Sequence, residues 1–241
     1  MKKLFEKHET LFCILLIILY ILINMYCVQN FGVTSYISSI INTIFSIGLV
    51  ILIVLLKRTS FYGLTKTTNN KECLYFIPLI LIVSVNLWGG INIKNSKTEI
   101  LFHILTMINI GFIEEIIFRG FLFKMMEKDN LKSAIIVSSV TFGIGHIVNL
   151  LNGADIIPTL LQIFSAISIG YLFVVIFHYS KSLIPCIITH SLINALSIFN
   201  SDSTLLLYIS SGFLMVMPII YTLYINKKLK IKKHNITIEK K

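Results

Sequence analysis

The sequence has few charged residues and few cysteines. Only 13% of its 241 residues are charged, whereas 56% are hydrophobic, and the mean hydropathy is +0.85. A soluble domain of this length needs a far more polar surface. The four cysteines (Cys13, Cys27, Cys73 and Cys186) form no CxxC pair, so we expect neither a disulfide framework nor a cysteine metal cluster. The composition indicates an integral membrane protein with a single domain over residues 1–241.

Several familiar signatures are also missing. The sequence contains no HExxH zinc motif, no GxSxG nucleophile motif and no internal repeat. Its net charge of +10 does not indicate a nucleic-acid partner, because the basic residues flank apolar segments and no polar segment is long enough for a nucleic-acid-binding module. The basic tail, residues 227–241, is instead predicted to be cytoplasmic and to contact anionic lipid headgroups.

Long apolar segments predict an all-α fold, a polytopic bundle of about eight transmembrane helices. One crossing needs about 20 apolar residues. The first segment follows a basic flank, as a signal peptide does, but it is longer than a usual signal core and no A-x-A site follows, so we expect a retained helix. The predicted spans are Leu11–Val28, Ile37–Leu56, Leu74–Ile91, Ile100–Phe118 (or to Met126), Ser133–Leu151, Thr159–His178, Leu183–Phe199 and Leu205–Ile225.

The distribution of basic residues predicts the orientation of these spans. With eight spans and the N-terminus inside, every lysine and arginine except Lys94 and Lys97 falls on the inner side. Positive charge concentrates on the cytoplasmic side of membrane proteins. We therefore expect both chain ends to lie inside.

Ionisable side chains within the spans indicate a functional site, because they are costly in lipid and usually face the bundle interior. The fourth span carries Glu114, Glu115 and Arg119, the fifth carries His146 and the seventh carries His190 and Asn194. At a rise of 1.5 Å per residue, Glu114, His146, His190 and Asn194 lie roughly 12–21 Å from the inner boundary. These four side chains are therefore predicted to meet in one polar pocket near mid-membrane. His103 and His178 are read as interfacial or loop residues.

Spacing within the helices refines this picture. Glu115 and Arg119 stand at i and i+4, where a carboxylate and a guanidinium can pair, whereas Glu114 points about 100° away. Gly143 and Gly145 are predicted to allow close helix approach beside His146.

The predicted pocket suits hydrolysis of an amide bond. A buried glutamate can act as a general base on water, and histidines can hold that water, bind a metal or donate to an oxyanion. Two histidines and one glutamate also form the ligand set of one class of catalytic zinc site, so Glu114, His146 and His190 are candidate metal ligands.

Three motifs in order resemble a known family of membrane proteases. EEIIFR matches EExxxR, FGIGH (Phe142 to His146) matches FxxxH, and HSLIN (His190 to Asn194) matches HxxxN. Together they resemble the CAAX-protease and bacteriocin-processing (Abi) family, with a protease core at about residues 100–199. The resemblance implies that Glu114 activates water, His146 holds that water, and His190 and Asn194 stabilise the oxyanion, while Glu115 and Arg119 brace the helix.

The resemblance leaves cofactor and substrate open. The family has been described both as metalloproteases and as enzymes with a metal-free glutamate mechanism, so zinc is one expectation. Eukaryotic relatives trim prenylated CaaX proteins. The composition rich in Ile, Asn and Lys looks bacterial, where relatives process secreted peptides or confer immunity against bacteriocins. We therefore expect a peptide or protein substrate in the plasma membrane of a bacterium.

Other classes of function remain open at this stage. A transporter would also place acids and histidines at mid-membrane, but it predicts repeats or broken helices in both halves, and neither is found. A non-enzymatic immunity or scaffold protein would tolerate Glu114→Gln, as would a pseudo-protease that binds substrates without cleaving them.

Overall fold

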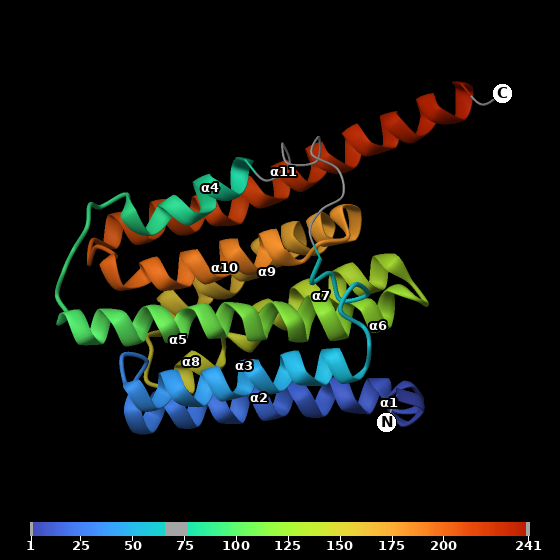
Figure 1. Ribbon diagram of the computed structural model, residues 1–241. Helices are drawn as coiled ribbons and strands as arrows, with labels where there is room; N and C mark the ends of the chain where they lie inside the picture. The colour runs from blue at the N-terminus through green and yellow to red at the C-terminus, as the bar shows by residue number, and fades with distance from the viewer. Residues whose placement is uncertain (1, 66–76, 240–241) are drawn as a thin grey trace.

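The chain folds into a bundle of helices that run along one common direction (Figure 1). The computed structural model describes residues 2–65 and 77–239, and within these residues it contains helices and no strand. This confirms the predicted all-α polytopic fold. The helices are α1 (Lys2–Lys7), α2 (Glu9–Phe31), α3 (Tyr36–Leu55), α4 (Ile77–Ser84), α5 (Lys97–Glu115), α6 (Lys124–Glu127), α7 (Leu131–Gly145), α8 (Val148–Leu151), α9 (Ile156–Ser180), α10 (Ile184–Leu196) and α11 (Thr204–Glu239).

Six helical segments of the described chain are long and apolar enough to cross a membrane. The third and seventh predicted spans form shorter apolar helices, Pro78–Leu87 and Ile184–Phe199. Pro185 in the first turn starts the second of these, and a 3-10 turn at Ser197–Phe199 ends it. Residues 74–76 of the third predicted span lie outside the described residues. The count of eight crossings and the orientation therefore stay predictions.

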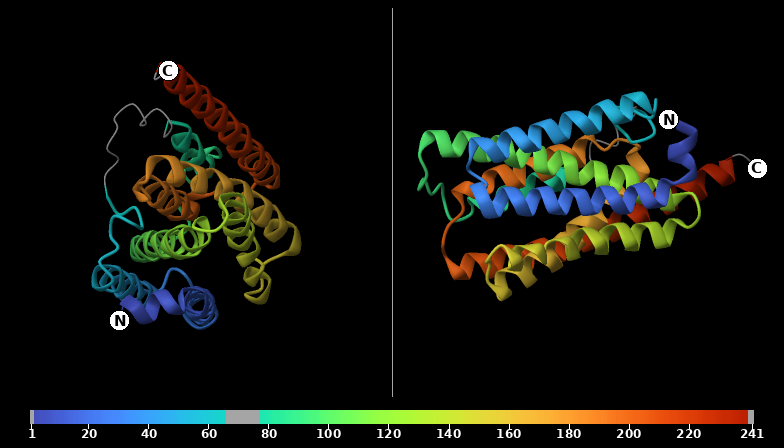
Figure 2. Two further views of the ribbon diagram at one scale, coloured as in Figure 1. Left: turned by 90° about the vertical axis from the view of Figure 1, so that its right-hand side faces the viewer. Right: turned by 90° about the horizontal axis from the view of Figure 1, so that it is seen from below.

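Burial separates the inner helices from the outer ones. In the most apolar 18-residue stretch of α9, 61% of the residues are buried. In the corresponding stretch of α11, only 11% are buried. Seen end-on, α2 and α3 lie on one side of the bundle and α11 on the other (Figure 2). α5 packs against α3 and α10, and α9 packs against α7 and α11. The interior of the bundle is thus formed around α5, α7, α9 and α10.

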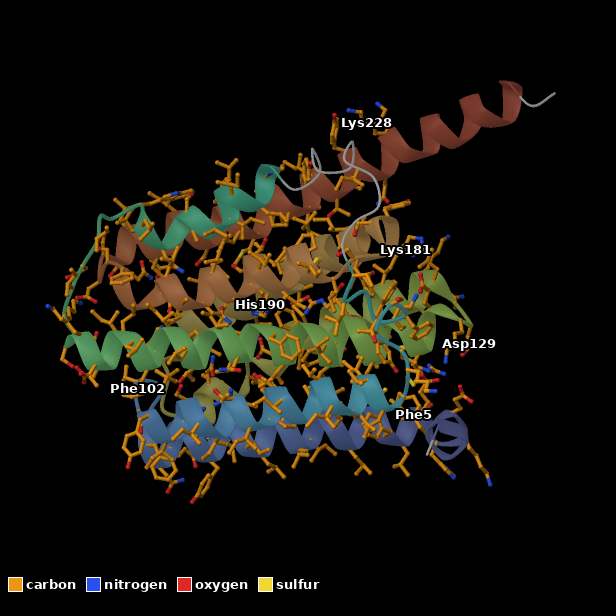
Figure 3. All side chains as sticks on the ribbon, viewed as in Figure 1. Phe5, Phe102, Asp129, Lys181, His190 and Lys228 are labelled. Atoms are coloured by element: carbon orange, nitrogen blue, oxygen red, sulfur yellow. The ribbon has the colours of Figure 1, made fainter. Side chains whose placement is uncertain are left out.

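Charged side chains gather at one end of the bundle. Figure 3 shows Asp129, Lys181 and Lys228 at the end that carries the first and last described helices, opposite Phe102. At this end Arg58 donates to Glu6 over 2.7 Å, and Lys128 pairs with Glu9. The clustering follows the predicted positive-inside pattern, in which basic residues flank the helices on one side.

Two glycines set the closest helix contacts. A Cβ at Gly111 would lie 2.7 Å from the backbone N of Ser191, so α5 and α10 meet there. A Cβ at Gly143 would lie 2.8 Å from the carbonyl oxygen of Ile163, which joins α7 to α9 as predicted. The same prediction is wrong for Gly145, which has no neighbour within 4 Å of such a Cβ because it faces away from the α9 contact. The contact at Gly111 holds together the two helices that carry Glu114 and His190.

Candidate active site

The two acids stand at the junction of two kinds of helix. α5 ends at Glu115, and the chain continues without a break as a π-helix over Ile116–Phe123, whose eight residues are all buried. π-helical turns are rare and frequently occur at functional sites, because they widen the helix and re-aim its side chains. The sequence pattern predicted a continuous α-helix here. Hydrophobic periodicity does not distinguish the two helix types when every residue is apolar or buried.

Glu115 and Arg119 form the predicted ion pair. Arg119 Nη1 donates to Glu115 Oε1 over 3.0 Å, and both side chains are 0% exposed. Taking two charges out of solvent is costly unless they are paired in good geometry. Each of the two charges is compensated only by other side chains of this cluster. The pair therefore fixes the place in the bundle where α5 meets the π-helix.

Phe142 and Gly170 complete the surroundings of Arg119. The guanidinium carbon lies 4.0 Å from the centre of the Phe142 ring, a cation–π contact. A Cβ at Gly170 would lie 3.0 Å from Arg119 Nη2, so the glycine leaves room for the guanidinium. Phe142 also meets the rings of His146 and His190 edge to face, at 5.3 and 5.5 Å. One aromatic ring thus links the ion pair to both histidines.

His190 bridges the two acids. Its Nδ1 lies 2.8 Å from Glu115 Oε1 and its Nε2 lies 3.2 Å from Glu114 Oε2. The His190 side chain is 7% exposed and that of Glu114 is 13% exposed. α5 and α10 therefore bring Glu114 and His190 together, as their predicted depth in the membrane implied. The contact of His190 with Glu115 was not predicted.

The second oxygen of Glu114 has a partner that sequence reasoning missed. Tyr20 of α2 donates its hydroxyl to Glu114 Oε1 over 2.5 Å, and Asn24 Nδ2 donates to the same hydroxyl over 3.3 Å. The Tyr20 ring is buried and stacks on Phe45 of α3. A tyrosine in an apolar helix gives no sequence signal of this kind, because it is equally typical of simple packing. The spacing of Tyr20 and Asn24, at i and i+4, was the only available hint.

His146 lies at the end of α7, near the acids. Its Nδ1 lies 3.2 Å from the backbone oxygen of Phe142, and it interacts electrostatically with Glu114 and His190. A carbonyl oxygen only accepts hydrogen bonds, so Nδ1 carries the proton and Nε2 presents a lone pair. The neutral ring can therefore accept a hydrogen bond from a water molecule.

Asn194 lies one turn beyond His190 on α10. Its side-chain amide makes no hydrogen bond to the part of the chain that the structure describes, so it is available to a ligand. Its backbone oxygen lies 3.4 Å from Nε2 of His103, which also contacts Ser197 Oγ at 3.2 Å. His103 lies in a helix and not in a loop, and whether it is interfacial stays a prediction. It is 5% exposed, because α5 buries this face against α10.

The predicted metal ligands do not form a metal site in this arrangement. Among the described side chains, residues 5–65 and 78–228, no group of three or more His, Cys, Asp or Glu is placed to hold a metal ion. Glu114 and His190 touch each other, and the Nδ1 of His146 is taken by the Phe142 carbonyl. Since His146 Nε2 still presents a lone pair, zinc stays a prediction.

The fold and the site together define a polytopic membrane protein. Its buried Glu–His–Arg cluster is built from α5, the π-helix that continues it and α10, with His146 at the end of α7 and one hydrogen bond from α2. A family model described as type II CAAX prenyl endopeptidase Rce1-like matches residues 96–196. This segment contains every site residue predicted from the three motifs, and the match confirms the resemblance. Over this segment the chain is similar to the CAAX-protease family. No curated protein and no solved structure matches the chain.

Proposed function

We propose that the chain is an intramembrane endopeptidase that hydrolyses a peptide bond of a membrane-associated or secreted peptide. The observation that carries this proposal is the 3.2 Å contact between Glu114 Oε2 and His190 Nε2 inside a buried cluster. The composition rich in Ile, Asn and Lys supports a bacterial cell membrane as its location. The family match supports peptide-bond hydrolysis as the reaction class.

The Glu114–His190 contact holds one proton. His190 Nδ1 faces Glu115, which is paired with Arg119 and therefore accepts the Nδ1 proton. An unprotonated Nε2 and an ionised Glu114 would both be acceptors, so their 3.2 Å contact needs a proton between them. In the proposed mechanism this proton belongs to His190, which leaves the Glu114 carboxylate to accept a proton from water.

The proposed reaction uses these groups in sequence. Glu114 takes a proton from a water molecule that the lone pair of His146 Nε2 holds, and the water oxygen bonds to the carbonyl carbon. The free Asn194 amide donates to the resulting oxyanion. The C–N bond then breaks, and Glu114 returns the proton to the leaving nitrogen. Since both nitrogens of His190 face carboxylates, its role here is to position Glu114 and balance its charge.

Tyr20 is a positioning residue in this scheme. Tyr20→Phe removes the hydroxyl that holds Glu114 Oε1 and keeps the ring that stacks on Phe45. A hydrogen bond to a charged group contributes about 1.5–3 kcal/mol, so we expect kcat to fall at least tenfold. KM should stay near its wild-type value, whereas the midpoint of thermal unfolding should fall by a few degrees because a buried hydrogen bond is lost. Steady-state kinetics on the purified protein in lipid vesicles measure kcat and KM separately.

Tyr26→Phe is the matched control for this variant. Tyr26 lies on the same helix, but it is exposed and packs edge-on against Phe31. Its kcat should equal that of the wild type. A Tyr20→Phe enzyme with unchanged kcat, or one that loses activity only in proportion to lost folded protein, contradicts the positioning role.

The test of the proposed function is a search for new peptide termini. Peptides from membranes and medium would be compared by mass spectrometry between cells that make the protein and cells that lack it. We expect peptides that end at a common site only when the protein is present, and purified protein in lipid vesicles should reproduce that cleavage. Altered amounts of intact peptides without new termini would instead support a non-enzymatic immunity or scaffold role.

A further inference from the structure

A second polar site lies at the charged end of the bundle, away from Glu114. A pocket of about 220 Å³ opens there between the turn after α3, the start of α6 and the end of α9. Its lining combines three phenylalanines with a hydroxyl, an imidazole and two amino groups. The lining residues are Ser60, Phe61, Phe123, Lys124, Phe177, His178 and Lys181.

Direct contacts hold the walls of this pocket in place. Leu183 N donates to Gly63 O over 2.8 Å, and Ser182 Oγ donates to Thr65 O over 2.7 Å. A Cβ at Gly63 would lie 2.3 Å from the Phe177 ring, so the two segments approach as closely as a glycine permits. The pocket is therefore a feature of the packed fold and not a gap between loose loops.

Around the pocket, the described part of the chain places two lysines near one carboxylate, Glu127. Lys124 pairs with Glu127, which also lies 2.5 Å from His178 Nδ1. Lys124 also lies over the rings of Phe61 and Phe177, at 4.9 and 5.8 Å. The side-chain amino group of Lys181 makes no hydrogen bond or ion pair to the residues that the structure describes. Reduced contact with water and the neighbouring Lys124 lower the pKa of Lys181, although Glu127 raises it. An anion beside Lys181 would relieve this imbalance.

The backbone of Lys181 is held in an unfavourable conformation. It caps α9 in the left-handed region, with φ 57° and ψ 11°, where glycine is the usual residue. A lysine there costs roughly 1 kcal/mol relative to glycine. Strained positions of this kind cluster at ligand-binding sites, where the side chain is needed.

We propose that this pocket binds a phosphate group, supplied by the headgroup of an anionic phospholipid. The two lysines and the Ser60 hydroxyl provide donors for phosphate oxygens. The phenylalanines suit the apolar part of the lipid next to its headgroup. The pocket also lies toward the ends of the helices, where Figure 3 shows Lys181, and headgroups meet a membrane protein near the ends of its spans. The site is separate from the proposed catalytic reaction and stands whether or not that reaction is found.

The experiment compares Lys181→Gly with Lys57→Gly. Lys57 has a φ of 54°, is exposed and does not line the pocket. Both variants relax a left-handed backbone and remove one positive charge, so both should fold at least as well as the wild type. Thermal unfolding would be followed in a neutral detergent at constant ionic strength, with dihexanoyl phosphatidylglycerol or inorganic phosphate added.

We expect phosphatidylglycerol to raise the unfolding midpoint of the wild type and of Lys57→Gly by about 3 °C. Lys181→Gly should lose at least half of this shift. If inorganic phosphate gives the same shifts as the lipid, the site binds free phosphate and the assignment to a lipid is wrong. Equal lipid shifts in all three proteins, or no shift in any, would overturn the proposal.

Discussion

Glu114→Gln is expected to lower the rate of peptide cleavage by about a thousandfold, the range of general-base catalysis. Glutamine has the shape of glutamate and still accepts the Tyr20 hydrogen bond, but it cannot take a proton from water. The measurement is the single-turnover rate on the peptide that the search for new termini identifies, with the protein in lipid vesicles.

Glu99→Gln provides the matched control on the same helix. Glu99 caps the exposed start of α5, where it accepts from the backbone N of Ser96 over 2.8 Å. A glutamine can make the same capping contact, so this variant should cleave at the wild-type rate. Retention of more than a tenth of the wild-type rate by a folded Glu114→Gln protein would remove Glu114 as the base.

Arg119→Met is expected to lower the free energy of unfolding by about 3–5 kcal/mol, because it leaves the buried Glu115 carboxylate without its cation. The methionine fills much of the space between Phe142 and Phe173, so loss of charge compensation dominates over loss of packing. Unfolding of the detergent-solubilised protein, followed by circular dichroism, gives the change.

Lys94→Met is the comparison for an exposed ion pair. Lys94 pairs with Asp202, and their side chains are 47% and 81% exposed. Such pairs contribute about 0–1 kcal/mol, so this variant should stay within about 1 kcal/mol of the wild type. Adding Glu115→Gln to Arg119→Met should restore part of the lost stability. Equal losses from Arg119→Met and Lys94→Met would show that charge burial does not hold the α5 junction.

Sequence alone predicted those parts of the site that follow from spacing along one helix or from the constraints that a membrane imposes. The Glu115–Arg119 pair follows from its i, i+4 spacing, which survives the change from α-helix to π-helix. The meeting of Glu114 with His190 follows from their similar depth, since helices that cross a membrane rise by a fixed amount per residue. The all-α fold follows from apolar segments, because a lipid environment requires internally satisfied backbones.

Several features that the sequence did not predict depend on which face each helix presents to its neighbours. Tyr20 meets Glu114 only because α2 turns that face toward α5, and apolar helices carry little periodicity that would reveal it. The same uncertainty explains the error at Gly145 and the unexpected burial of His103. The shortness of α10 was also hidden, because an inner helix surrounded by protein need not match the thickness of the bilayer.

The hydrogen bond from Tyr20 to Glu114 joins residues 94 positions apart, and His190 follows Glu115 by 75 positions. During synthesis, α2, which supplies Tyr20, precedes α10, which carries His190 and Asn194. Until α10 docks, Glu115 and Glu114 lack their imidazole partner, so the proposed catalytic group is incomplete. On the proposed mechanism, a nascent chain therefore has no competent site with which to cleave itself or its neighbours, because the order of the helices along the chain delays activity until α10 is in place.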